Sequence, residues 1–344
     1  MVVNLRKVVL ISLILVFVFV IVAILSISLG TADIGLMKIL RGIFGWVSDP
    51  VRGWTDTDRV IVFQVRLPRI ILAGIVGAAL SVAGVVFQSL FRNPLADPYI
   101  LGISSGSAVG AILAIISGAG LSFLSIPAAS FCGALLTIML VLGIARMGIA
   151  RTGYRFQTNT LLLAGVIVGS FFSAIIMFLV SITQDERLHS IIFWLMGDLS
   201  LSKYNEIIIV TPFVIVGCLI IYLHAHPLNL IVTGEETALQ LGVEVERVKR
   251  LLLITASLIT GVVVSVSGVI GFVGLIVPHM MRMVFGSDHR LLLPVSGLFG
   301  LSFLVLADTI ARTIIAPVEL PVGVITAIFG APFFIYLLRR KGAI

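Results

Sequence analysis

The chain contains 344 residues, of which 59% are hydrophobic and only 11% are charged, and its mean hydropathy is +1.22. Soluble globular domains carry about 25% charged residues. The composition therefore excludes a soluble protein and predicts an all-α protein with several membrane-spanning helices. The net charge of +7 is assigned to loops beside the membrane, so we expect lipid rather than nucleic acid around the chain.

Apolar runs long enough to cross the ~30 Å hydrocarbon core recur along the sequence. They cover 8–29, 70–90, 99–118, 121–145, 159–181, 204–223, 291–311 and 320–338. The charge-free run 251–281 would measure about 46 Å as one straight helix, which exceeds the hydrocarbon core. Glycines and Pro278 interrupt this run, so it is predicted as one tilted span or two short ones.

The charges at the chain ends select between nine and ten spans. Arg6 and Lys7 precede the first span, and basic residues at 339–341 follow the last one. Basic residues favour the cytoplasmic side, so both termini are predicted there, which requires an even number of spans. We therefore predict ten spans in a single transmembrane domain over 1–344, with an external loop at 30–66 and a cytoplasmic segment at 225–250.

Two weaker patterns accompany the spans. The apolar stretch 188–199 is too short to cross, and we interpret it as an external interfacial helix with Trp194 near the headgroups. At an offset of 184 residues, several small residues and a proline recur between spans two and seven. The matching positions are Gly77, Ser81, Val82, Gly84, Val85, Pro94 and Gly102 with Gly261, Ser265, Val266, Gly268, Val269, Pro278 and Gly286. They predict an inverted repeat of spans two to five and seven to ten, although such abundant residues also coincide by chance.

Small residues at helical spacing mark two further segments. Gly102, Gly106 and Gly110 recur every four residues after the turn signals of Asn93-Pro94. Gly165, Gly169 and Ser173 repeat the spacing on the fifth span. Such stripes let helices approach closely, so packing is the simplest interpretation of both.

Chemistry-bearing residues are scarce. Ion-coupled carriers keep titratable groups at mid-membrane, whereas such groups are few here, notably His279 and Arg282 around Pro278, and Asp308 and Arg312 near the outer end of the ninth span. The sequence contains no HExxH, GxSxG or GxxxxGK[ST] motif, so we expect no catalytic residue and no ATP site on this chain. Two cysteines in apolar runs predict neither a disulfide framework nor a metal site.

The segment 225–250 differs from the rest because it is charged and amphipathic. Ala238, Leu241, Val245 and Val248 follow helical spacing, and Gly242 predicts a break between two short helices. A helix lying on the bilayer is one interpretation. Four acidic residues among the polar positions disfavour anionic lipid and favour a protein partner.

A family resemblance then emerges from eight segments in order along the chain. They are RLPR (66–69), NPLADPYILGISSG (93–106), LLLAG (161–165), GEETALQLGV (234–243), GFVGLIVPHMMR (271–282), DHRLLLP (288–294), LADTIAR (306–312) and ELPVGVITAIFGAP (319–332). The chain resembles the permeases of ABC importers for cobalamin, haem and ferric siderophores. The resemblance implies a type II ABC importer permease with ten helices in the cytoplasmic membrane of a prokaryote. It also implies a second permease subunit, usually an identical one, an external binding protein and two cytoplasmic ATPase subunits that hold ATP and Mg.

The resemblance also assigns roles by position. External docking to the binding protein is implied for Arg66, Arg69 and Arg312. The cytoplasmic gates are implied to be Asn93, Leu95, Thr158 and Asn159. Coupling to the ATPase is implied for Gly234, Glu235, Ala238, Leu241 and Gly242. The stripe of Gly165, Gly169 and Ser173 falls on a helix that lines the central path of such importers.

Two other functions stay open on the sequence alone. An ion-coupled secondary carrier of a bulky solute would take up its substrate as a lone chain in response to a proton or sodium gradient. A scaffold or signalling protein would show no uptake under any energy source. The cargo of an importer is also open, because no residue discriminates between cobalamin, haem and a ferric siderophore.

Overall fold

A computed structural model describes residues 4–30, 32, 34, 35, 37–39, 54–118, 125–152 and 158–340. All regular structure among these residues is helical. Seven of their helices are long and apolar enough to cross a membrane, and three shorter apolar helices accompany them. The elements are α1 (Leu5–Ser28), α3 (Asp56–Arg59), η1 (Val60–Arg66), α4 (Leu67–Leu90), η2 (Pro98–Leu101), α5 (Ile103–Ile116), α6 (Ser125–Thr152), α7 (Thr158–Ser181), α8 (Asp185–Met196), α9 (Tyr204–Leu223), α10 (Ala225–Thr233), α11 (Glu235–Gln240), α12 (Val245–Ser267), α13 (Val273–Phe285), α14 (His289–Thr313) and α15 (Val322–Arg340).

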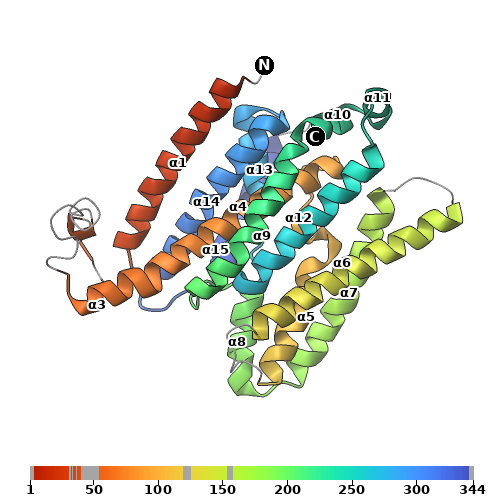
Figure 1. The fold of residues 1–344 in the computed structure, drawn as a ribbon. Coiled ribbons are helices and arrows are strands. Elements are labelled where there is room, and N and C mark those ends of the chain that lie inside the picture. The colour runs from red at the N-terminus through yellow and green to blue at the C-terminus, as the bar shows by residue number, and fades with distance from the viewer. Residues whose placement is uncertain are drawn as a thin grey trace.

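Helices α1 and α4 occupy opposite environments (Figure 1). The most apolar part of α1 is only 17% buried, so its branched and aromatic side chains face the surroundings of the bundle, where lipid would lie. The corresponding part of α4 is 83% buried. Gly77 and Gly84 allow this, because a Cβ on either would collide with the backbone of Gly300 or Gly274. Small residues thus place α4 at the centre.

The uncertain run 251–281 forms two helices, α12 and α13. Gly268 ends α12 with a φ of +66°, a conformation that suits glycine. The next residue, Val269, donates its backbone N–H to the carbonyl of Trp194 at 3.3 Å. The break is thus held by the end of α8, so one continuous helix over 251–281 is excluded.

Two predicted segments differ in detail from the observed helices. Residues 56–66 of the predicted external loop are helical and continue into α4, and their external position stays a prediction. Thr55 starts this helix with a capping box, in which its hydroxyl accepts from Asp58 N and the Asp58 carboxylate accepts from Thr55 N. The predicted helix at 188–199 begins earlier, at Asp185, and its Trp194 is half-buried by neighbouring elements. Its position at a membrane surface stays a prediction.

Both chain ends lie toward the same end of the bundle as α10 and α11 (Figure 1). This arrangement agrees with an even number of crossings. Helices α4 and α12 run in opposite directions and pack against each other, as an inverted repeat requires. The offset of 184 does not hold past α12, however, because Pro94 lies in a turn and Pro278 inside α13. The repeat and the count of ten spans stay predictions.

Candidate functional site

A hollow of about 440 Å³ lies between η2, α5 and α7. Its lining includes Gly165, Gly169 and Ser173, the predicted stripe on the fifth span, together with Tyr99 and Gly102. The glycines also pack, because a Cβ on Gly165 would meet the backbone of the η2 segment. The stripe therefore brings η2 against α7 and leaves the space beside them open. The packing interpretation is therefore supported, and a place of this hollow on the transport path stays a prediction.

The η2 turn is held in place by two polar side chains. Asp97 precedes it, and its carboxylate accepts from the Tyr99 backbone N–H at 2.9 Å. The Tyr99 hydroxyl donates to the Ile270 carbonyl at 2.9 Å and accepts from the Ile270 N–H at 3.3 Å. Burial raises the pKa of Asp97 to about 6, while the bond from Tyr99 N–H opposes the shift. Tyr99 thus ties one wall of the hollow to the break between α12 and α13.

The predicted gate residues lie at two helix ends. Asn93 and Leu95 are on the turn after α4, where the Asn93 carboxamide oxygen accepts from Leu95 N at 2.9 Å and Leu95 is 43% exposed. Thr158 and Asn159 begin α7, and Asn159 is exposed. Residues 153–157, which precede them, lie outside the described residues. A gating role for both pairs stays a prediction.

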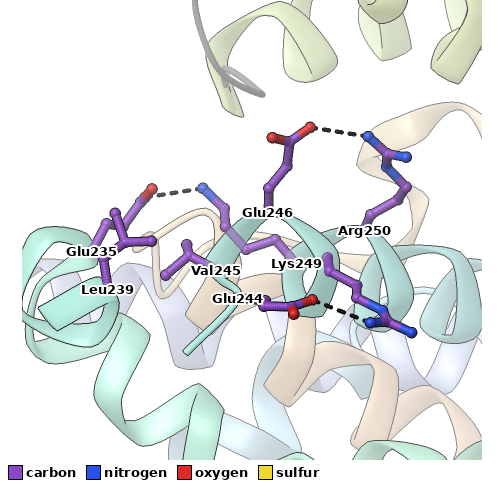
Figure 2. Close-up of a pocket in the computed structure, with 8 residues that line it drawn as sticks. Glu235, Leu239, Glu244, Val245, Glu246, Lys249 and Arg250 are labelled. Atoms are coloured by element: carbon purple, nitrogen blue, oxygen red, sulfur yellow. Dashed lines mark hydrogen bonds and ion pairs between the residues drawn. The ribbon is translucent and has the colours of Figure 1, made fainter. Parts of the chain in front are cut away.

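A second hollow, of about 380 Å³, opens between α11 and the start of α12. Figure 2 shows Glu235 and Leu239 on α11 facing Lys249 and Val245 on α12. The Lys249 ammonium lies 2.9 Å from the Glu235 carboxylate, and the lysine side chain is 5% exposed. The pair Arg250–Glu246 lies at the rim, with both side chains in the open. The ion pair of Lys249 therefore fixes α11 on α12.

The predicted coupling residues separate into two kinds. Leu241 is 62% exposed, and Glu235 presents nearly half of its side chain, so both are available to a partner. Ala238 is fully buried and anchors α11. Gly242 has a φ of +82°, which favours glycine, whereas Gly234 is extended and imposes no such requirement. We use "coupling surface" below for the exposed residues Glu235, Leu239, Leu241, Glu244 and Glu246.

The three arginines predicted to dock a binding protein are buried. Arg69 binds the Asp308 carboxylate at 2.9 Å and Glu319 at 2.6 Å, with 4% of its side chain exposed. Arg312 donates to the Ser26 carbonyl at 2.7 Å and lies 3.6 Å from Asp308. The free surface charge expected for docking is therefore absent from these two side chains.

Arg66 completes this arginine cluster. It donates to the Ile27 and Ser28 carbonyls at the end of α1 and is 3% exposed. The sequence interpretation missed the acidic partners Asp308 and Glu319. The spacing of Asp308 and Arg312 by four residues on one helix was a usable signal for the first of them. A docking role for the cluster stays a prediction.

Comparisons with known proteins agree on one family. The model of the FecCD transport family matches residues 17–340. The chain is 42% identical over 326 residues to the ABC transporter permease protein YvrB of Bacillus subtilis, covering 92% of this chain and 90% of that protein. It is 47% identical over 289 residues to the cobalamin import system permease protein BtuC of Halobacterium salinarum, covering 84% and 76%.

Further matches agree. The hemin transport system permease protein HmuU of Yersinia pestis is 37% identical over 320 residues, with 92% of each chain covered. Among solved structures, an inward-facing metal-chelate type ABC transporter superposes with a TM-score of 0.83 at 33% identity. The match covers 96% of this chain and 99% of that one.

Proposed function

This chain belongs to the FecCD transport family and is an ABC importer permease, and from that premise we propose that it carries a metal chelate across the membrane. Relatives named for cobalamin and hemin, and a structural neighbour of metal-chelate type, support this class of cargo. The cargo would enter a path between two permease subunits, and the gates would open alternately. The chain would perform no bond-making chemistry, and partner subunits would hydrolyse ATP with Mg.

The hollow beside α7 is the observation that carries this proposal. Most of its lining residues are small, with Tyr99 and Met177 among the larger ones, and its polar side chains are hydroxyls rather than charged groups. A bulky chelate held loosely in such a space leaves easily, whereas a tight site would slow release. Asp308, a buried acidic residue near the end of α14, is engaged by Arg69, so an ion-coupled carrier finds little support.

The assembly follows from the same premise. Seven long and three shorter apolar helices support ten spans. With α10, α11 and both chain ends in the cytoplasm, the coupling surface would meet the ATPase and the arginine cluster would lie near the external face. A second permease subunit, usually an identical one, would complete the path, and a binding protein would deliver the chelate from outside. The setting would be the cytoplasmic membrane of a prokaryote.

The cargo is tested on the binding protein that supports transport by this chain. We expect its visible spectrum after purification to be that of a corrinoid, a haem or a ferric siderophore, since these chelates absorb differently. A colourless binding protein that retains a sugar, peptide or amino acid would overturn the proposed cargo class.

Transport is tested in liposomes that contain the permease with its ATPase subunits. Uptake of the identified cargo should require both ATP and the binding protein. The control is the permease alone under a proton or sodium gradient, where no uptake is expected. Uptake by the lone chain under such a gradient would instead establish a secondary carrier.

A further inference from the structure

A chain of hydrogen bonds joins α10 to α4 at the end of the bundle that carries the coupling surface. The Ser89 hydroxyl of α4 lies 2.6 Å from Nε2 of His289, at the start of α14. Nδ1 of the same imidazole lies 2.6 Å from the carboxamide oxygen of Asn229 on α10. The Asn229 amide nitrogen then donates to the Asp288 carboxylate at 2.8 Å. Four side chains thus connect three helices.

The donors and acceptors allow only one direction for this series of hydrogen bonds. The Asp288 carboxylate accepts, so Asn229 must turn its amide nitrogen toward it and its oxygen toward His289. Nδ1 of a neutral His289 then carries the proton, and Nε2 accepts from the Ser89 hydroxyl. The His289 backbone N–H also donates to the Asn229 oxygen, at 2.9 Å. Asn229 donates through its amide nitrogen and accepts through its oxygen, which fixes the orientation of its carboxamide.

This arrangement resembles the nucleophile, base and orienting residue of a hydrolase, but burial excludes that role. Ser89 is 5% exposed and His289 3% exposed. A nucleophilic serine needs a substrate carbonyl about 3 Å from its hydroxyl. The neighbouring helices leave no room for a substrate there. This series of hydrogen bonds is therefore a structural connection between helices.

A second connection runs from α10 to the first residues of the gate loop, which we define as residues 91–97. Arg92 donates from Nη2 to the Ile231 carbonyl at 3.0 Å. Its backbone has a φ of +46°, in the left-handed region. Asn93 N donates to Gln88 O and Arg92 N to Ser89 O, so Arg92 follows the C-cap Phe91 and occupies the left-handed position where glycine is usual. A non-glycine residue is strained in this conformation. The arginine at this position supplies a side chain that reaches α10.

These two connections converge on α10, which leads directly into α11 and the coupling surface. We propose that Asn229, His289, Ser89 and Arg92 are positioning residues that transmit a displacement of α10 to the gate loop. This proposal rests on the proposed function, in which an ATPase moves the coupling surface. Without the two connections, α10 would move relative to α4, and the gate loop would stay behind.

The test follows the accessibility of the gate loop in the assembled transporter with its ATPase subunits. Leu95→Cys is placed in a chain carrying Cys132→Ser and Cys218→Ser, and maleimide labelling is timed with ATP plus vanadate and without nucleotide. We expect the two rates of this parent to differ about fivefold or more, the size of ordinary coupling between sites. Ser89→Ala and Arg92→Gly should each reduce the difference to less than about twofold, while ATP hydrolysis continues.

Ser81→Ala is the matched control. Ser81 is buried on the same helix, and its hydroxyl donates to the Gly77 carbonyl one turn earlier, within α4. The Ser89 hydroxyl lies equally near the Val85 carbonyl, at 2.7 Å, but its single proton points to His289 on another helix. Its labelling difference should equal that of the parent. Arg92→Gly guards against a folding artefact, since glycine suits the left-handed conformation and should keep the helix end intact.

The outcomes are separable. Parent-like labelling differences in both Ser89→Ala and Arg92→Gly overturn the inference. The inference is also overturned if the parent is labelled at the same rate with and without nucleotide while its ATPase subunits hydrolyse ATP, because the gate loop then does not move. A chain that binds no ATPase subunit overturns the proposed function itself, and the inference falls with it.

Discussion

Arg69 and Arg312 are buried within the arginine cluster and bonded to residues of this same chain, whereas Leu241 and Glu246 of the coupling surface stand in the open. Both regions contain charged residues beside a membrane span. The family resemblance assigns docking of the binding protein to the first region and docking of the ATPase to the second. A buried ion pair contributes mainly to the position of its helices, while an exposed residue is free to bind. Burial, rather than charge, distinguishes the two regions.

The largest effect is expected from breaking the buried pair. Arg69→Met removes the main partner of Asp308, which is 1% exposed, and should cost about 3–5 kcal/mol of stability. Thermal unfolding of the detergent-solubilised chain measures the loss. The double variant Arg69→Met with Asp308→Leu should recover most of it, because apolar residues replace the pair. Arg59→Met, at an exposed position, is the control. If the Arg69→Met chain kept its stability and lost only docking of the binding protein, the distinction between the buried arginine cluster and the exposed coupling surface would be wrong.

A binding defect without a stability defect is expected at the coupling surface. Leu241→Asp should weaken association with the ATPase subunit about tenfold, since an exposed apolar contact is replaced by a charge. The melting temperature should not change. Leu201→Asp serves as control, because Leu201 is 79% exposed on the turn between α8 and α9, away from α11. Equal binding by the two variants would remove Leu241 from the interface.

Glu319 allows a milder test of docking by the arginine cluster. It is 39% exposed and neutralises part of the charge of Arg69. Glu319→Gln keeps the pair of Arg69 with Asp308 and should make the nearby surface more positive. We expect an acidic binding protein to associate about two- to threefold faster at low ionic strength, and no difference at high salt. An association rate that changes neither with the variant nor with the salt concentration would show that docking occurs elsewhere.

The smallest effect concerns Asp97, which is only half-buried and so lies between the two regions in exposure. Burial raises its pKa to about 6 from 3.8, so the folded chain favours the protonated carboxyl. The resulting stability is full below pH 3.8 and is lost as the pH rises through about 6. Relative to Asp97→Asn, the natural chain should lose stability over that interval, by less than the ~3 kcal/mol to which a shift from 3.8 to about 6 corresponds, because water screens the half-buried carboxyl. If the melting temperatures of both chains changed equally with pH across this range, the prediction would be contradicted.

The sequence predicted the long spans because partition into a bilayer depends on local composition. The runs at 8–29 and 204–223 correspond closely to α1 and α9. Their ends were less predictable. The helix before α4 begins at Asp56 within a predicted loop, and α12 begins at Val245, inside the predicted cytoplasmic segment 225–250. A helix outside the apolar core is stabilised by capping and by contacts, which a hydropathy pattern does not record.

The small-residue stripe of α7 shows the same division. Its spacing predicted close packing, and Gly165 does pack against η2. That Gly165, Gly169 and Ser173 also line a hollow depends on what lies opposite, which is the η2 turn held by Tyr99. The link from Ile231 to Arg92 was equally invisible, since it joins a backbone carbonyl to a loop residue far along the chain.

By itself, the amino-acid order determined that this is a membrane protein, where most helices cross and which family it belongs to, because these properties reside in short stretches of sequence. Only the tertiary structure decided which charges are free. Arg69 and Asp308 lie far apart in sequence and meet only when α4 packs on α14. Burial of a polar group requires a partner, and that partner is chosen by packing in three dimensions.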